Sequence, residues 1–267
     1  MAEFKYNKSD LSYAVLDERK TQFLKQVDEY FRNVTLTMGA EEIHIPSLLN
    51  LDVLRRCGYL ESFPHHLTIP TYLKKAEFDR SDKNVEIDNS RIEVSDRCLT
   101  PAACLHIYPY LEGKKIRDKI ITTRASVYRH EDEAYDEKVR LWNFHVREIV
   151  FVGSRQFVKG KLEEFSAISL SYAKKIGVDA HLIDAHDHFH PTKRNDIKKR
   201  LQEQNFVKKE LSVSIRGNNA AIASFNYHDT HFSAPFNFSE NSRIVTGCVG
   251  FGLERWVAAI DKREGRE

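Results

Sequence analysis

The sequence predicts an α+β fold in which an antiparallel sheet is flanked by helices. Two observations support this class: strand-like segments outnumber helical ones, and several strand-like segments follow one another directly along the chain. No internal repeat and no proline-rich linker interrupts the pattern. Residues 16–267 are therefore expected to form a single domain, preceded by a polar leader over residues 1–15.

The first helix is predicted over residues 16–38. Its apolar residues recur at the three- and four-residue steps of a helix: Leu24, Val27, Phe31 and Val34. Gly39 occupies a position that commonly follows a helix end. A short strand over 42–45 then ends at Pro46, which has no amide hydrogen to donate to a neighbouring strand. Two short alternating stretches, 85–87 and 92–94, predict a surface hairpin.

Two longer strands are predicted over residues 120–128 and 144–152, joined by the polar segment 130–141. A helix over 155–176 follows, with a buried stripe at Phe157, Phe165, Ile168 and Tyr172. The predicted order then continues with a strand (181–185), a helix (195–204), two strands (209–215 and 220–225), a strand (243–248), a glycine turn and a helix (252–260).

Composition excludes several classes of protein. There are 41 Lys and Arg residues against 39 Asp and Glu, a net charge of +2, so overall charge does not favour a dedicated nucleic-acid binder. No apolar run approaches the roughly 18 residues of a membrane helix, and the first residues lack an apolar signal core. The four cysteines are scattered and form no CxxC pair, so a disulfide framework is not expected. A cytoplasmic location is therefore expected.

Two groups of residues carry candidate chemistry. The first is VYRHE (127–131) followed, after the polar loop, by FHVRE (144–148); the second is GCVGFGLER (247–255). Arg129 and Glu131 share one face of a strand because strand side chains alternate. Alone, an Arg-x-Glu pair could be a surface ion pair and the glycine series a tight turn. Their occurrence together and in this order is more specific.

In this order the strings resemble motifs 2 and 3 of the class II aminoacyl-tRNA synthetase catalytic domain, and GAEEIHIP (39–46) resembles motif 1, which forms the dimer interface in that class. One branch is similar at six strings: GYLESFP, LTPAAC, YRHE, FHVRE, SFNYHDTHF and TGCVGFGLERW. That branch contains the amino-acid:carrier-protein ligases, homologues of atypical zinc-dependent seryl-tRNA synthetases. The resemblance runs from about residue 20 to 262 and implies a class II synthetase-type sheet.

The resemblance implies an ATP site, with Mg²⁺ accompanying the nucleotide. Arg129 would be the catalytic residue, holding the α-phosphate and touching the amino-acid carboxylate, because in-line attack needs alignment and charge neutralisation. Glu131 would accept a hydrogen bond from the adenine amino group. Phe144 would stack on one face of adenine. Arg255 would cover the other face and reach the γ-phosphate, and Arg140 would be an additional phosphate contact.

The resemblance also implies a zinc site at Cys104, Glu148 and Cys248. Three protein ligands leave one tetrahedral position open, which the α-amine of an amino acid would fill. Taken alone, each cysteine is typical of a buried, inert thiol. Cys57 and Cys98 match no ligand position and are expected to be structural.

A second metal site is suggested by His186, His188 and His190 in AHDHFH, because alternation on a strand would place all three on one face. The resemblance favours a loop here, with Asp187 and Phe189 at the better-matched positions.

The amino-acid pocket is predicted beside Cys248. Gly250 would face the same side of an extended strand and leaves room, which predicts a substrate that can be larger than glycine, of alanine or serine size. Asn226, in SFNYHDTHF, is assigned to the same pocket.

Together these features predict an enzyme, a homodimer that forms an aminoacyl-adenylate from ATP and a small amino acid. The predicted acceptor is the phosphopantetheine thiol of a carrier protein. Transfer to tRNA is not expected, because only about 16 residues precede the first helix and Ala102 stands where seryl enzymes carry a serine-recognising Glu. Two alternatives stay open: transfer to tRNA or a small-molecule amine, and a non-catalytic synthetase-like binding or regulatory module.

Overall fold

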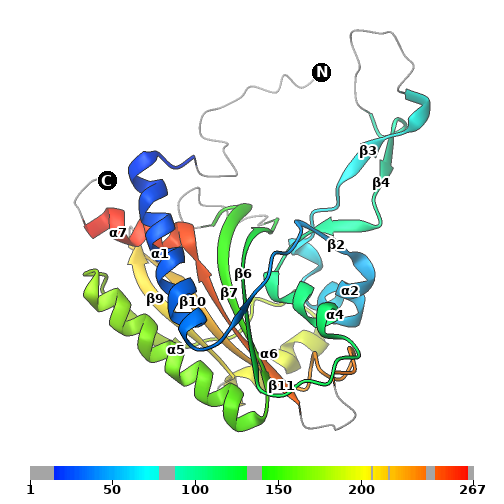
Figure 1. The fold of residues 1–267 in the computed structure, drawn as a ribbon. Coiled ribbons are helices and arrows are strands. Elements are labelled where there is room, and N and C mark those ends of the chain that lie inside the picture. The colour runs from blue at the N-terminus through cyan, green and yellow to red at the C-terminus, as the bar shows by residue number, and fades with distance from the viewer. Residues whose placement is uncertain are drawn as a thin grey trace.

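The computed structural model describes residues 15–77, 88–130, 140–205, 207–215, 217–238 and 244–263. Its main feature is a seven-stranded sheet with the strand order β1-β6-β7-β11-β10-β9-β8 (Figure 1). Strands β1 and β6 pair in parallel, and every other neighbouring pair in this sheet is antiparallel. Helices flank the sheet, so the predicted α+β class with a mainly antiparallel sheet is confirmed.

The strands of the main sheet have these bounds: β1 (Glu41–Glu42), β6 (Lys119–Tyr128), β7 (Asn143–Gly153), β8 (Ala180–Asp184), β9 (Lys208–Ile215), β10 (Asn218–Asp229) and β11 (Val245–Gly252). Two small sheets pair β2 (Leu48–Asn50) with β5 (Arg97–Leu99), and β3 (Thr71–Leu73) with β4 (Ile92–Val94). The α-helices are α1 (Glu18–Thr37), α2 (Leu51–Arg56), α3 (Tyr59–Ser62), α4 (Ile107–Leu111), α5 (Arg155–Lys175), α6 (Lys193–Asn205) and α7 (Leu253–Arg263). The 3₁₀ turns are η1 (Pro64–His66), η2 (Lys75–Glu77) and η3 (Ala103–His106).

The two faces of the main sheet bury different cores. On one face α1, α5 and α7 pack against the strands, and Phe31 of α1 stacks on Phe251 of β11 with ring centroids 3.7 Å apart. On the other face α2, α3, η3 and α4 enclose a second apolar cluster that includes Cys104, Tyr108 and Cys248. Because strand side chains alternate, the β7 and β11 residues that do not face the first core line this second face. Within the described residues, no helix combines the length and apolar character that crossing a bilayer demands.

A buried polar group ties the first helix to the sheet. Arg147 of β7 is 2% exposed, and its Nε donates to Asp28 of α1 at 2.6 Å. Its Nη1 donates to Glu42 of β1 at 3.0 Å. A buried ion pair needs such complete partnering to offset its desolvation. The motif 1-like segment is therefore held to the strand that carries Glu148.

Most predicted elements are present, and one expectation is wrong. Residues 92–94 form a strand that pairs with β3, and the other predicted arm of the hairpin, 85–87, lies outside the described residues. The expected glycine turn after Cys248 is absent, because β11 continues to Gly252. A Cβ at Gly250 would lie 3.0 Å from Glu148 Oε2, so this glycine makes space between strands. The division into a leader over 1–15 and one domain over 16–267 stays a prediction, since residues 1–14 lie outside the described part.

Candidate active site with a metal-binding cluster

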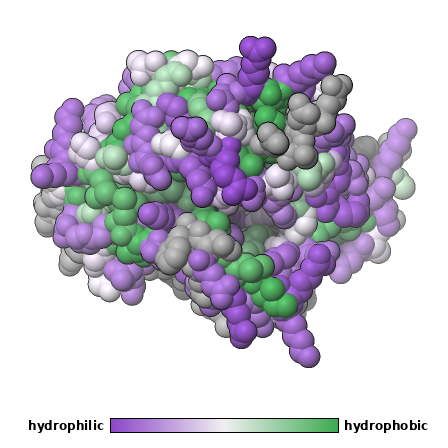
Figure 2. Space-filling model, turned by 90° about the horizontal axis from the view of Figure 1, so that it is seen from below, coloured by the Kyte–Doolittle hydropathy of each residue, from purple (hydrophilic) through white to green (hydrophobic). Residues whose placement is uncertain are grey.

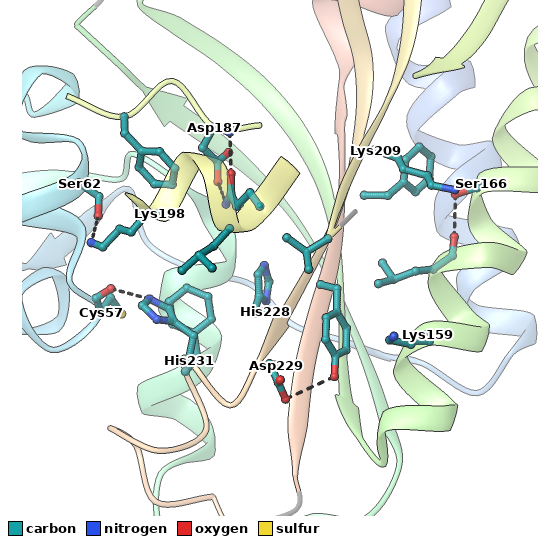
Figure 3. Close-up of a pocket in the computed structure, with 18 of the residues that line it drawn as sticks. Cys57, Ser62, Lys159, Ser166, Asp187, Lys198, Lys209, His228, Asp229 and His231 are labelled. Atoms are coloured by element: carbon teal, nitrogen blue, oxygen red, sulfur yellow. Dashed lines mark hydrogen bonds between the residues drawn. The ribbon is translucent and has the colours of Figure 1, made fainter. Parts of the chain in front are cut away.

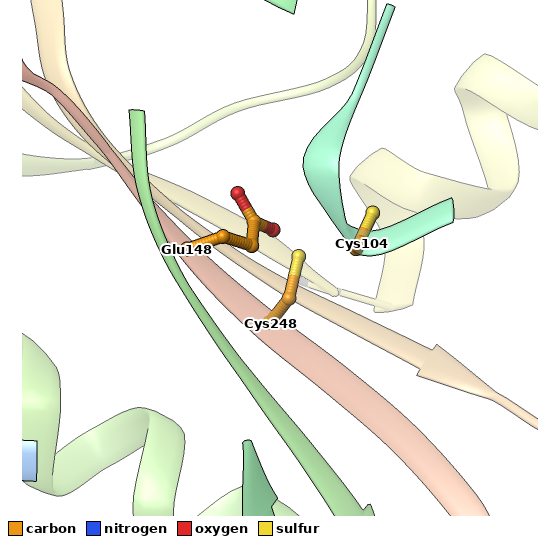
Figure 4. A group of neighbouring side chains, drawn as sticks. All are labelled: Cys104, Glu148 and Cys248. Carbon is orange, nitrogen blue, oxygen red and sulfur yellow. The ribbon is translucent and has the colours of Figure 1, made fainter. Parts of the chain in front are cut away.

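Three side chains from distant parts of the chain converge on the second face of the sheet. Cys104 comes from η3, Glu148 from β7 and Cys248 from β11, and their ligand atoms all lie within 4.8 Å of one another (Figure 4). All three are buried. Within the described ranges this is the one group of His, Cys, Asp or Glu side chains close enough to share an ion. The structure thus brings together the ligand set that the resemblance implied.

Strand register explains how two of these residues meet. Gly250 pairs with Glu148, and Cys248 pairs with Val150 two residues along the same ladder. Glu148 and Cys248 are therefore diagonal neighbours on one face, a separation that long side chains can bridge. Because Gly250 has no side chain, the Glu148 carboxylate can fold across it toward Cys248.

The protonation chemistry of the cluster favours a cation. Burial raises the pKa of Glu148 to about 7, although hydrogen bonding to Cys248, the charge of Arg129 and hydrogen bonding to Cys104 all oppose the rise. Hydrogen bonding to Cys104, then burial and the charge of Glu148, raises the pKa of Cys248 well above its ordinary value. Three buried acids cannot all lose their protons without a compensating charge, which a bound divalent cation supplies. Two sulfurs and one carboxylate fit zinc and leave a fourth tetrahedral position for a ligand.

An orphaned hydroxyl next to the cluster supports the same interpretation. Tyr108 is fully buried, and its hydroxyl has no hydrogen-bond partner among the described residues. Tyr108 follows Cys104 by four residues and packs in the same apolar cluster, with its ring stacked on Phe232 at 4.1 Å. A buried polar group without a partner is costly, so an additional acceptor such as a thiolate is expected there in the working state. Sequence reasoning missed Tyr108, although its helical spacing from Cys104 was a usable signal.

Two residues of β10 line the cluster. The predicted substrate residue Asn226 donates from Nδ2 to Cys248 Sγ at 3.6 Å. His228, which sequence reasoning missed, places Nε2 3.7 Å from the same sulfur and Nδ1 3.2 Å from Thr246 Oγ1. Burial lowers the pKa of His228 to about 3, so its imidazole is neutral near pH 7. Alternation within SFNYHDTHF places Asn226 and His228 on one face and could have revealed His228.

Arg129 lies between the cluster and Phe144. Its Nε donates to the Pro101 carbonyl at 2.9 Å, and its guanidinium carbon lies 5.6 Å from the centroid of the Phe144 ring. Its positive charge also acts on Glu148 and opposes the rise of that pKa. Phe144 and Glu148 are four residues apart on β7 and share a face. The three side chains therefore follow one line along the sheet, from Phe144 through Arg129 to Glu148.

Arg255 reaches the same end of the sheet from α7. Its Nη1 donates to the Ala221 carbonyl of β10 at 2.9 Å. A Cβ at Gly252 would lie 3.8 Å from Arg255 Cδ, so the side chain crosses the last residue of β11. Gly252 pairs with Val146, two residues from Phe144. The two predicted adenine contacts thus lie at one end of β7 and β11.

The structure says less about the two remaining predicted nucleotide contacts, Arg140 and Glu131. Arg140 is half-buried, and its charge adds to burial in lowering the pKa of His188, which places Arg140 near the loop between β8 and α6. Glu131 lies outside the described residues.

The histidine-based metal site is wrong. His186, His188 and His190 lie in a loop after β8, not on a strand, and among the described side chains they form no group that could hold an ion. The two residues between them are structural anchors instead. Asp187 accepts from Lys208 Nζ at 2.6 Å and from Gln202 Nε2 at 2.8 Å, and Phe189 stacks on Phe63 at 5.1 Å.

A cavity of about 1130 Å³ lies beside the cluster, between α5 and α6 at the end of β10 (Figure 3). His228, whose ring also contacts Cys248, forms part of its wall. Its other lining residues combine an apolar surface with charged side chains of both signs. The apolar residues include Leu162, Leu170, Leu201, Val207, Phe225 and Tyr227, the cations are Arg155, Lys159, Lys198 and Lys209, and the carboxylates are Glu163, Asp187 and Asp229. The view from below shows hydrophobic side chains exposed around a hollow on this side of the molecule (Figure 2).

No family model matches the chain. Amino acid--[acyl-carrier-protein] ligases 1 and 2 of Bradyrhizobium diazoefficiens are each 27% identical over 241 residues, covering 86% of this chain and 73% and 71% of theirs. The type-2 serine--tRNA ligase of Methanothermobacter thermautotrophicus is 24% identical over 271 residues, covering 92% of this chain and 52% of its own.

Solved structures show the same fold. The M. kandleri SerRS, solved in complex with A. aeolicus tRNASec, aligns with a TM-score of 0.74 at 20% identity and covers 91% of this chain. Giardia lamblia prolyl-tRNA synthetase with prolyl-adenylate aligns with a TM-score of 0.65 at 12% identity and covers 92%. The chain spans about half the length of these two structures, 52% and 47%. The predictions of a class II synthetase-type fold and of an amino acid ligase of that class are confirmed at this level.

Proposed function

We propose that this chain activates a small amino acid with ATP and Mg²⁺ as an aminoacyl-adenylate, and then transfers the aminoacyl group to the phosphopantetheine thiol of a carrier protein. The observation that carries the proposal is the line from Phe144 through Arg129 to the Cys104, Glu148 and Cys248 cluster. Adenylate formation needs the adenine, the α-phosphate and the amino acid in this order. The line supplies an aromatic surface, a cation and a candidate amine site in that sequence.

The activation step depends on Arg129. The amino-acid carboxylate attacks the α-phosphorus, a C–O–P link forms, and the bond to the β-phosphate oxygen breaks to release pyrophosphate. Negative charge grows on the phosphates, and a guanidinium fork can neutralise it while also contacting the carboxylate. Pro101 and Phe144 hold the Arg129 side chain, which reduces the reorganisation that the step requires.

The amino acid is bound at the cluster. Zinc held by Cys104, Glu148 and Cys248 would offer its fourth position to the α-amine, which selects free α-amino acids. Asn226 lies directly against Cys248 and provides a polar contact for the bound amino acid. His228 lies against Cys248 and Tyr108 packs in the same apolar cluster, so both side chains are expected to border the bound amino acid.

The acceptor side is supported by α6 and by the cavity. Helix α6 exposes Ile197 and Leu201, one turn apart, among basic side chains: Lys193, Arg194, Lys198, Lys199 and Arg200. Such a surface fits an acidic partner helix. Lys198 and Leu201 also line the cavity, which reaches His228 beside Cys248. A long arm could enter here, and its thiol sulfur would attack the adenylate carbonyl, forming a C–S bond, displacing AMP and releasing the thiol proton.

Two further features complete the proposal. All four cysteines are free and buried, which suits a reducing cytoplasm where the ligand thiols stay unoxidised. A homodimer is proposed from the resemblance of residues 39–46 to motif 1.

ATP–pyrophosphate exchange across a panel of amino acids, with zinc removed and restored, tests activation. Exchange is expected with a small amino acid and only with zinc present, and Arg129→Ala should lower it by about 10²-fold or more. The exposed Arg97 provides a matched control, since Arg97→Ala should retain activity. Absence of exchange with every amino acid would support the binding-module alternative instead.

Labelled amino acid offered to a carrier protein and to tRNA tests the acceptor. Label on the carrier, released by hydroxylamine, is expected. The double variant Lys193→Glu/Arg200→Glu should weaken transfer while leaving exchange unchanged, because these side chains lie on α6 away from the cluster. Label on tRNA alone would favour the alternative acceptor, tRNA, which the similarity to type-2 serine--tRNA ligases supports.

A further inference from the structure

Glu254, in the first turn of α7, contacts His145 of β7 at two points. The His145 backbone N–H donates to Glu254 Oε2 at 2.8 Å, and His145 Nδ1 lies 2.7 Å from Glu254 Oε1. A carboxylate only accepts hydrogen bonds, so both His145 groups are donors. The Glu254 side chain is 10% exposed, which shields both contacts from water.

The strand ending explains why this contact exists. Gly252 is the last residue of β11 and pairs with Val146, so His145 is the first residue of this part of β7 without a β11 partner. The Glu254 carboxylate accepts from its backbone N–H in place of a strand neighbour. A carboxylate in the first turn of a helix is also stabilised by the helix dipole.

The contact lies next to both predicted adenine residues. Phe144 precedes His145 in the sequence, and Arg255 follows Glu254. Alternation places the side chain of His145 on the face opposite Phe144, the face where Arg147 binds Asp28. Glu254 therefore lies behind the nucleotide site and fixes the backbone of α7 relative to β7.

We propose that Glu254 is a positioning residue for ATP, and that its two-point contact with His145 sets the separation of Phe144 and Arg255 across the adenine. This inference rests on the proposed nucleotide site. Loss of the contact lets the start of α7 shift against β7. The cluster is unaffected, because Glu148 lies further along β7 and is held by the paired β11 strand.

Glu254→Gln in the full-length chain tests the proposal. The amide keeps the size of the side chain, but its oxygen can accept from one donor while its NH₂ group faces the other. The KM for ATP in pyrophosphate exchange is expected to rise about tenfold, as small misplacements of binding groups do, with the KM for the amino acid unchanged. Calorimetry with a non-hydrolysable ATP analogue should show the same loss of affinity without turnover.

Two controls separate positioning from folding. Asp28→Asn makes the same carboxylate-to-amide change at a buried contact on the same face, and should lower the unfolding temperature while leaving the affinity for the analogue unchanged. His145→Ala removes the ring contact and keeps the backbone one, so its effect should be smaller and should add nothing to Glu254→Gln. If Glu254→Gln does not fold, His145→Ala alone still tests the proposal.

Two outcomes distinguish the two proposals. Equal affinity of wild type and both contact variants for the analogue overturns the positioning role. Failure of the wild type to bind the analogue overturns the proposed function itself.

Discussion

Glu148 combines a place in the candidate metal cluster with an unfavourable burial, and a bound cation would reconcile the two. Burial raises the pKa of Glu148 to about 7, because water no longer stabilises the charged carboxylate. A carboxyl group that keeps its proton cannot bind a metal in the usual way. Cys248 faces the same conflict, because hydrogen bonding to Cys104 and burial raise the pKa of its thiol well above the ordinary value. Because a cation would stabilise all three deprotonated side chains together, metal binding and folding of this face are expected to be linked.

The first prediction concerns the cysteines. Cys248→Ser and Cys104→Ser should abolish retention of zinc through dialysis, because a hydroxyl is a poor zinc ligand. Cys57→Ser is the matched control, since Cys57 is buried in the same apolar cluster but does not belong to the three-residue group. Metal analysis of the purified variants measures the difference. Equal zinc content in all three variants would contradict the assignment.

The second prediction is a pH dependence that belongs to Glu148. Its pKa is about 7 in the fold against an ordinary 4.5, so between these values the folded state keeps a proton that the unfolded state has lost. The free energy of unfolding of the metal-free protein should therefore fall as pH rises from 4.5 to 7, relative to Glu148→Gln. The variant is needed because His66 and His228, with pKa values lowered to about 3 by burial, act in the opposite direction.

Urea unfolding of both proteins across this pH range measures the effect. Saturating zinc should reverse it, because metal binding requires deprotonated ligands and strengthens as pH rises. Curves that stay parallel for wild type and Glu148→Gln without metal would show that Glu148 is not buried as the structure has it.

At the scale of the element, β11 shows how one strand serves two faces. Val249 and Phe251 pack into the core under α1 and α7, while Cys248 and Gly250 face the cluster. From the sequence, Gly250 is expected to leave room for an amino-acid side chain. The structure shows that Glu148 lies close to this position, with Oε2 3.0 Å from where a Cβ would be.

Gly250→Ala is therefore predicted to weaken zinc binding by about tenfold, the loss typical when a ligand's supporting contact is disturbed. The added methyl group would displace the Glu148 carboxylate by a few tenths of an ångström. Gly160→Ala on α5 is the control, because its Cβ would meet nothing within 4 Å and alanine favours a helix. Competition with a chromophoric chelator measures both. Tighter or unchanged zinc binding in Gly250→Ala would contradict the packing argument.

Local patterns predicted most elements but not their partners. Helices α1 and α5 were predicted from the spacing of apolar residues around Phe31 and Phe165. This works because the buried side of a helix recurs every three or four residues in the sequence. The pairing of β3 with β4 could not be derived this way, since short strands carry little periodicity and their register depends on distant contacts. The end of β11 was predicted wrongly, as a glycine turn, for a related reason. Gly250 of this strand makes space for a side chain on neighbouring β7, and such a contact cannot be read from local sequence.

At the scale of the whole molecule, the sheet separates stability from function. One face carries the helical core of α1, α5 and α7, and the other carries the cluster, Arg129 and Phe144. The resemblance could therefore predict that Cys104, Glu148 and Cys248 lie together, because matched motifs contain them. It could not predict His228, Tyr108 or the cavity beside α6, because these depend on how separate elements meet in space.

The last prediction is the assembly state. Among the described residues, exposed apolar side chains gather on β2, β3, β4 and the turn before β3: Leu48, Ile69, Tyr72 and Val94, between 39% and 63% exposed. The motif 1-like segment (39–46) itself buries Ile45 within the chain and pairs its two glutamates internally. A dimer would therefore cover the neighbouring small sheets as well as this segment.

Light scattering at micromolar concentration should give twice the mass of the chain, and Tyr72→Ser/Val94→Ser should shift it toward the monomer with unchanged helix content. Ile197→Ser, an equally exposed apolar site on α6, should leave the dimer intact, because α6 is assigned to the acceptor. A monomeric wild type would contradict the homodimer. A dimer that survives the double variant would move the interface away from β3 and β4.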